Sequence, residues 1–386
     1  MAPGSCFIIR RAWWISGDGR SLKSGPRSNA KADGRWIPGY TTPPNRPVPD
    51  QPLQPNGSYT FFEDAKSFDH FASFNRSTTQ LGQQGEGRNV TNGELGWARW
   101  LAAEGDDEDQ TDGMNAADAV RILEKVKDKP FFLGVGFHKP HDPFHAPKKY
   151  FDLFPPESIQ LHRQPTNRTE DLELAIPSQK PIFAKFTDQE RMEFKRAYLA
   201  CTAFMDAQVG KILDKLTELD LWDNTIVIFA SDHGYHLGEH AWWNKVTVFE
   251  QGARSPLIAW VPGITKAGTS TSSLIEFIDL YPTLADLCEL DLPHEMDGES
   301  FAPILKDPKH PGKTTAYTQV VRGPLMGRSV RTDQWRYTEW DFGREGKELY
   351  AHPQDPIEYH NLANKPDLAK IQQHLKILLN SNFPAE

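Results

Sequence analysis

The stretch TIVIFASDHGYHLGEHAWWNK occupies residues 225–245 and combines a strand signal with a dense set of reactive side chains. Its first part, TIVIFA (225–230), is a continuous apolar run rich in β-branched residues, which is typical of a strand buried on both faces of a sheet. Asp232, His233 and Gly234 follow at once, and Lys245 lies further along. Because open α/β sheets bind ligands beyond the carboxyl ends of their strands, the stretch predicts a central strand with a site at its end.

Helix and strand patterns alternate on both sides of this stretch. A helix is predicted over 115–129 with Asn115 as N-cap, and a second over 187–219, where Thr187 and Glu190 form a capping-box pattern. A third helix is predicted over 277–290, and apolar strands are predicted at FFLGVGF (131–137) and SPLIAWVP (255–262). This alternation predicts an α/β fold, in which a mixed, mostly parallel sheet is sandwiched by helices.

The two ends of the chain differ from this middle part. Residues 1–60 are rich in Gly, Ser, Pro and Arg without a lasting period, and they predict an irregular segment. Residues 61–265 are predicted to form the core and residues 266–386 a C-terminal segment. Short strand-like runs within about 315–360, followed by a helical pattern near 367–380, predict a small C-terminal α+β subdomain with an antiparallel sheet.

Composition excludes several classes of protein. The 386 residues carry a net charge of −9, which argues against non-specific binding of nucleic acid. No apolar run reaches the roughly 18 residues that span a bilayer, so no transmembrane segment is expected. The first twenty residues do not form a signal-peptide pattern, because Arg10 and Arg11 interrupt the apolar stretch. Cys6, Cys201 and Cys288 have no metal-ligand spacing and are too few for a disulfide framework. Localisation and oligomeric state are left open.

A second predicted strand also ends in polar sequence. FFLGVGF is followed by HKPHDPFHAP, which places His138, Lys139 and His141 at the end of that strand. We expect them at the same sheet edge as Asp232 and His233. An aspartate in this position is an N-cap, a turn former or a metal ligand, and the adjacent His and Gly favour the ligand.

Lys245 indicates which kind of ligand binds at this edge of the sheet. A lysine beside a bound Ca²⁺ or Mg²⁺ implies that an anion is bound as well, and a cation with an ammonium is the pairing that a phosphate or sulfate group requires. His141 can donate to the same anion. The alternative is that Lys245 is a surface lysine and His141 a loop residue bonded to backbone.

The same residues lie within longer stretches that resemble the sulfatase family, of the alkaline-phosphatase-like superfamily, and most of all the iduronate-2-sulfatases and their bacterial relatives. The resemblance covers residues from about 113 to the end. It rests on these motifs: PFFLGVGFHKPHDPFHAPKKYFDLFPPE (130–157), YLACTAFMDAQVGKILDKL (198–216), NTIVIFASDHGYHLGEHAWWNK (224–245), RSPLIAWVPG (254–263), IDLYPTLADLCEL (278–290), DGESFAPIL (297–305) and SVRTDQWRYTEW (329–340).

The resemblance implies a hydrolase that removes sulfate from a sulfated sugar, as in glycosaminoglycan or polysaccharide degradation. It implies that Asp232 and His233 bind a metal, usually Ca²⁺, and that His141 and Lys245 bind the sulfate. Its further implications are a substrate pocket lined by His138, Lys139, Tyr235 and His236, and a loop fixed by Glu239 and His240. Members of the family are typically exported, periplasmic or lysosomal.

One part of the family pattern is missing from the sequence. Sulfatases carry a Cys or Ser in C/S-x-P-x-R, which is oxidised to formylglycine, and an Asp-Asp pair that completes the metal shell. Cys6 has an Arg at the right distance but no Pro, and Ser24 has the Pro but Ser28 in the Arg position. We therefore expect that the first part of the sulfatase domain is absent, and that metal binding and activity are weak.

Two alternatives to a working sulfatase follow. The first is a non-catalytic, sulfatase-like protein that binds sulfated glycans, or a truncated relic of such an enzyme. The second is a phosphohydrolase of the same superfamily, because phosphate and sulfate have nearly the same shape.

Overall fold

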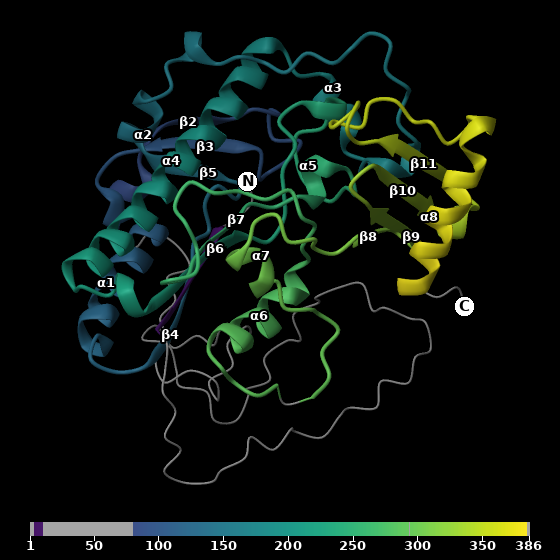
Figure 1. Ribbon diagram of the computed structural model, residues 1–386. Helices are drawn as coiled ribbons and strands as arrows, with labels where there is room; N and C mark the ends of the chain where they lie inside the picture. The colour runs from purple at the N-terminus through teal and green to yellow at the C-terminus, as the bar shows by residue number, and fades with distance from the viewer. Residues whose placement is uncertain (1–3, 11–79, 293, 384–386) are drawn as a thin grey trace, which may run out of the picture. The chain divides into compact units, whose positions relative to one another are not determined.

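The computed structural model describes residues 4–10, 80–292 and 294–383 (Figure 1), and all of them belong to one compact unit. The Ser24 motif and most of the predicted irregular segment lie outside the described residues.

The central sheet holds the strand ends that matter for function. It has the strand order β4-β1-β6-β7. The bounds of its strands are β1 (Gly4–Arg10), β4 (Phe131–Gly136), β6 (Thr225–Ser231) and β7 (Leu257–Trp260). Since β1 is antiparallel to both β4 and β6, these two strands run in the same direction, and Gly136 and Ser231 end them at the same edge. This confirms that the two polar strand ends lie together.

The pairing within this sheet corrects one expectation. All three described strand pairs are antiparallel, whereas a mostly parallel sheet was predicted. The reason is β1, which comes from the predicted irregular segment and lies between β4 and β6. An apolar run shows that a strand is buried but carries no information about its direction.

Helices cover the central sheet on two sides (Figure 1). On one side, α1 (Thr111–Val126) and α4 (Asp188–Glu218) enclose a core with β4 and β6. On the other, α6 (Leu280–Leu287) and α7 (Ala302–Lys306) pack on β6 and β7. The α/β class is thereby confirmed, and the predicted strand at 225–230 is the element that both cores share.

The two long helices begin differently from one another. In α4 the Thr187 hydroxyl accepts from the Glu190 amide and the Glu190 carboxylate accepts from the Thr187 amide, so the predicted capping box is confirmed. In α1 the N-cap is Gln110, not Asn115. The Asn115 amide instead donates to the carbonyl oxygen of Gly136 at 3.0 Å, which ties the first turns of α1 to the end of β4.

A second sheet and an aromatic core lie beside the central sheet. The sheet consists of β2 (Gly85–Asn89), β3 (Arg99–Ala103) and β5 (Phe144–Pro147), and its β3–β5 pair is parallel. Helices α2 (Lys148–Asp152) and α4 pack against this sheet, and the other short helices of the region are α3 (Lys180–Ala184) and α5 (Glu250–Ala253). The core is built from large rings, among them Phe144, Phe194 and Trp243.

The C-terminal subdomain has the predicted form. Four antiparallel strands follow in sequence order, with the bounds β8 (Ala316–Arg322), β9 (Leu325–Arg331), β10 (Trp335–Trp340) and β11 (Gly346–Ala351). Helix α8 (Ala369–Asn382) lies against this sheet (Figure 1). Its Leu375 and Leu379 pack against Val330, Tyr337 and Leu349. Across the described ranges, every helix is too short or too polar to cross a membrane.

Candidate functional site

The loop after β4 places two imidazole rings side by side. The ring centroids of His138 and His141 lie 4.9 Å apart. The Nδ1 atom of His141 is 2.5 Å from the carbonyl oxygen of Asp142, so this nitrogen is the donor and Nε2 is left for another partner. The carboxylate of Asp142 is also close, with 3.3 Å between its Oδ1 and His141 Nδ1.

Lys245 is brought to these rings by a tightly held backbone. Its amide donates to Asn244 Oδ1 at 2.8 Å, and its carbonyl accepts from Trp242 Nε1 at 2.9 Å. Arg322 of β8 donates to the carbonyl of the next residue, Val246. Among the residues that the structure describes, none forms an ion pair with the Lys245 ammonium. The backbone is thus fixed, and the nearby carboxylates of Asp142 and Asp232 favour the charged form of the side chain.

Charged groups from the two strand ends act on one another. Burial, together with the charges of Lys139, His141 and Lys245, lowers the pKa of His138 to about 3. Burial also lowers the pKa of His233 and that of Lys245, and the charge of Lys245 contributes to the lowered pKa of His233. Groups from β4 and from β6 therefore disfavour one another's positive charge. A bound anion would reverse that effect and raise these pKa values.

Asp232 and His233 offer a partial metal shell. His233 Nδ1 lies 2.8 Å from the Gly234 carbonyl and is therefore the protonated nitrogen, which leaves the Nε2 lone pair free. That Nε2 is 3.5 Å from Asp232 Oδ2, a spacing that lets both bind one cation. The donor set fits a divalent ion, but Ca²⁺ takes about 6–8 oxygen ligands, so two side chains hold only a fraction of its shell.

Three predicted pocket residues lie inside the protein instead. The Lys139 ammonium donates to two backbone carbonyls, and Tyr235 donates from its hydroxyl to the Trp243 carbonyl at 3.2 Å. His236 is fully buried, with Nε2 2.7 Å from Thr247 Oγ1. The structure therefore does not bring their polar atoms to the site. Sequence spacing places a residue on a loop but does not decide which side of the loop it faces.

The loop residues Glu239 and His240 have the expected fixing contacts. Glu239 Oε2 accepts from the Leu237 amide at 2.7 Å. His240 is buried, with Nδ1 2.7 Å from Asp171 Oδ1 and Nε2 2.8 Å from the Ile357 carbonyl.

Two residues near the site were missed from the sequence. Asp112 is buried in the first turn of α1 and accepts from the amides of His138 and Lys139. Asp142 touches His141, and its charge acts on Lys245. The available signals were an acidic residue at a helix start and the His-Asp-Pro order in the loop. Cys201 offers no substitute nucleophile, because it is buried and burial raises its pKa to about 12.

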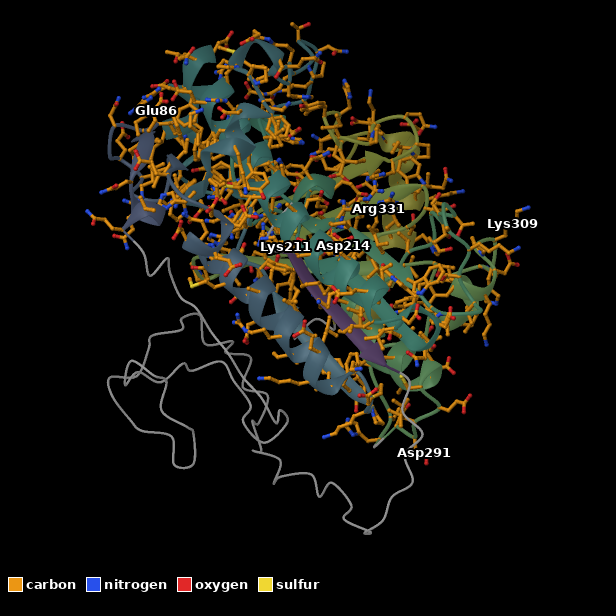
Figure 2. The ribbon with its side chains drawn as sticks, turned by 90° about the vertical axis from the view of Figure 1, so that its left-hand side faces the viewer. Glu86, Lys211, Asp214, Asp291, Lys309 and Arg331 are labelled. Carbon is orange, nitrogen blue, oxygen red and sulfur yellow. The ribbon has the colours of Figure 1, made fainter. Side chains whose placement is uncertain are left out.

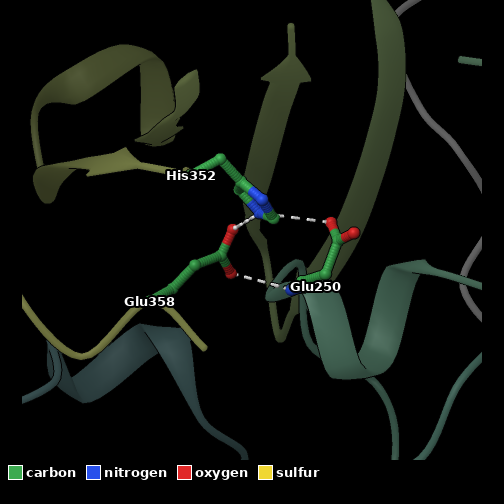
Figure 3. Close-up of side chains that lie close together, drawn as sticks. All are labelled: Glu250, His352 and Glu358. Atoms are coloured by element: carbon green, nitrogen blue, oxygen red, sulfur yellow. Dashed lines mark hydrogen bonds and ion pairs between the residues drawn. The ribbon is translucent and has the colours of Figure 1, made fainter. Parts of the chain in front are cut away.

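A second group with metal-ligand spacing is formed by α5 and the segment after β11. Glu250, His352 and Glu358 each offer an atom within 4.8 Å of the others (Figure 3). The same oxygens already bind Arg336, however, at 2.5 Å for Glu250 Oε2 and 2.6 Å for Glu358 Oε1. A metal ion would have to share them with a buried guanidinium. We therefore interpret the group as an ion-pair network that joins α5 to the C-terminal sheet.

This network gives a pH-dependent prediction. Burial alone would lower the pKa of His352, but the Glu250 and Glu358 carboxylates outweigh it and raise the pKa above 6.5. The resulting stabilisation is complete below pH 6.5 and disappears as the pH rises through the folded-state pKa. His352→Gln should therefore lower the free energy of unfolding by about 2 kcal/mol near pH 5.5, and by much less near pH 9.

Urea denaturation at both pH values measures this difference. His374→Gln, which changes an exposed histidine of α8, is the matched control and should show no such pH dependence. An equal loss for His352→Gln at both pH values would contradict the charged interaction.

Family models cover most of the described chain. A model described as "Sulfatase" matches residues 50–290, and one described as "N-sulphoglucosamine sulphohydrolase, C-terminal" matches residues 238–383. The first spans both strand ends, and the second spans the C-terminal sheet and α8.

A curated protein agrees with the family models, and two solved structures share the fold. The chain is 30% identical to "Iduronate 2-sulfatase" of Mus musculus over 66% of this chain and 62% of that protein. It matches a structure solved "in complex with its substrate D-Glucosamine-2-N, 6-O-disulfate" with a TM-score of 0.58 and 21% identity, over 71% and 69% of the two chains. It also matches a phosphonate monoester hydrolase from Silicibacter pomeroyi with a TM-score of 0.64 and 21% identity, over 73% of this chain and 61% of that chain. The chain thus spans less than two thirds of the curated relative.

Proposed function

Because this chain belongs to the sulfatase family, we propose that it acts on sulfate esters of sulfated sugars through the site formed at the ends of β4 and β6. The observation that supports the proposal is the convergence of His138, His141 and His233 with Lys245 in one charged patch, in which Asp142 and Asp232 supply the carboxylates. An anion bound there would favour the protonated forms of these groups and accept hydrogen bonds from them.

Each residue has a distinct role in this proposal. Lys245 and His141 Nε2 bind oxygens of the sulfate group, and the hydrogen bonds to the Lys245 backbone keep its stem in place. Asp232 and His233 would hold a divalent cation, which supplies charge stabilisation when it is bound. His138 is neutral at neutral pH, and a neighbouring sulfate favours its protonation.

Substrate class is proposed from the relatives. One carries the name iduronate 2-sulfatase, and another was solved with a disulfated glucosamine as its substrate. Both named compounds are sugars, which supports a sulfated carbohydrate as the ligand of this chain and a role in breaking down glycosaminoglycans or other sulfated polysaccharides.

Two alternatives each have one supporting observation. A glycan-binding protein without turnover is supported by the sequence, which contains no C/S-x-P-x-R motif to supply the nucleophile. A phosphohydrolase is supported by the fold similarity to phosphonate monoester hydrolase. The same charged patch serves all three functions, so ligand measurements have to separate them.

Calorimetric titration with D-glucosamine-2-N,6-O-disulfate in the presence of CaCl₂ tests the proposal, with unsulfated glucosamine and glucosamine 6-phosphate as comparison ligands. We expect binding of the disulfate and none of glucosamine. Ion chromatography for released sulfate then separates a hydrolase from a binding protein. Tighter binding of the phosphate ester would favour the phosphohydrolase, and equal binding of glucosamine would overturn all three.

A further inference from the structure

Lys139 has an unusual position for a charged residue. It lies between the two site histidines in sequence, yet only 8% of it is exposed. Burying an ammonium group costs free energy unless partners compensate it, and replacing buried charges with apolar groups often leaves stability unchanged or improved. The buried ammonium of Lys139 is therefore better explained by a specific structural role than by packing alone.

The ammonium of Lys139 joins two parts of its own loop. It donates to the carbonyl of His141 at 3.1 Å and to the carbonyl of Pro143 at 2.7 Å. The His141 amide in turn donates to the His138 carbonyl at 2.9 Å. The side chain therefore closes the loop from its buried side, while the rings of His138 and His141 lie next to each other.

Asp112 holds the start of the same loop from helix α1. Its Oδ1 accepts from the His138 amide at 2.8 Å and its Oδ2 from the Lys139 amide at 2.7 Å. Asp112 is 1% exposed, and its negative charge favours the positive charge of Lys139. Both oxygens thus hold the backbone of His138 and Lys139 at the start of the loop.

We propose that Asp112 and Lys139 form a clamp that positions His138 and His141 for anion binding. Neither residue touches the ligand, so both are positioning residues. The role of the clamp in anion binding rests on the proposed sulfate site. Its effect on the geometry of residues 138–143 does not depend on that site. Without these contacts, the rings of His138 and His141 would no longer be held at a fixed distance from each other.

Lys139→Met tests the clamp, because methionine keeps most of the volume and cannot donate. In protein carrying labelled histidine, NMR should detect the contact between the His138 and His141 rings in the wild type and lose it in the variant. The dissociation constant for inorganic sulfate should rise about tenfold. If this variant does not fold, Asp112→Asn keeps the side-chain volume and removes one acceptor, and it should weaken the same ring contact.

Lys313→Met is the matched control, since Lys313 lies outside this loop and its partly buried ammonium pairs with Glu276 at 2.8 Å and Asp279 at 2.7 Å. It should lower the melting temperature and leave both the ring contact and the sulfate affinity unchanged. A ring contact that persists in Lys139→Met overturns the clamp, as does its loss in Lys313→Met. If the wild type binds no sulfate, the proposed function falls, while the ring contact still decides the clamp.

Discussion

Arg336→Met is expected to lower the free energy of unfolding by about 3–5 kcal/mol at neutral pH, because it removes the cation from a buried pair of carboxylates. The Arg336 side chain is 3% exposed and the Glu358 side chain is fully buried. Glu250 also contacts Arg331 of β9, which Figure 2 labels, but at the longer distance of 3.5 Å. The two carboxylates would then depend on His352 and on the longer contacts of Glu250 with Arg331 and, at 3.9 Å, with Arg254.

Chemical denaturation of the variant measures this loss. Arg344→Met is the matched control, since Arg344 pairs with Asp341 at the surface and is 68% exposed, and it should cost at most about 0.5 kcal/mol. The double variant Arg336→Met, Glu358→Gln should lose less than the sum of its single changes. A loss for Arg336→Met no larger than that of the control would contradict the network.

Lys245→Ala should raise the dissociation constant for inorganic sulfate by about 10–100-fold, because a charge-assisted hydrogen bond is lost. The lowered pKa of Lys245 adds a pH dependence with a definite sign. The affinity for sulfate should fall as the pH rises, because only the ammonium form of Lys245 binds the anion. The fall should begin at a lower pH than it would for a lysine with an ordinary pKa. Titration of wild type and variant at several pH values provides the measurement.

Lys309→Ala removes the same charge from a different place. Lys309 is exposed and points outward from the molecule (Figure 2), so its loss should change sulfate affinity by less than twofold. Equal weakening in both variants would mean that net charge, and not the site at the strand ends, governs the binding.

Local sequence patterns predicted most of the elements around this site. The apolar run at 225–230 and the Thr187–Glu190 pair are both local, and the structure confirms both. The sequence did not reveal β1, because a strand in the central position is fixed by two partners far away in the chain. The start of α1 was missed for a similar reason, since Asn115 bonds to β4 and not to its own helix.

The site was predictable in outline and not in the direction of its side chains. Asp232, His233, His141 and Lys245 come from two strand ends, and the direction of β4 and β6 brings those ends to one edge. Lys139 and His236 were expected beside them and lie inside. A lysine or a histidine in a loop satisfies its polar atoms equally well with a ligand or with backbone, and only the fold decides between them.

The position of β1 has a consequence for how the chain reaches its folded state. Cys6 pairs with Val135 on one side and with Phe229 on the other, each more than a hundred residues further along the chain. Contacts between residues so distant in sequence give a high contact order, and loop closure over such lengths slows folding. The central sheet, and with it the edge that holds the histidines, should therefore assemble late, after the local helices have formed.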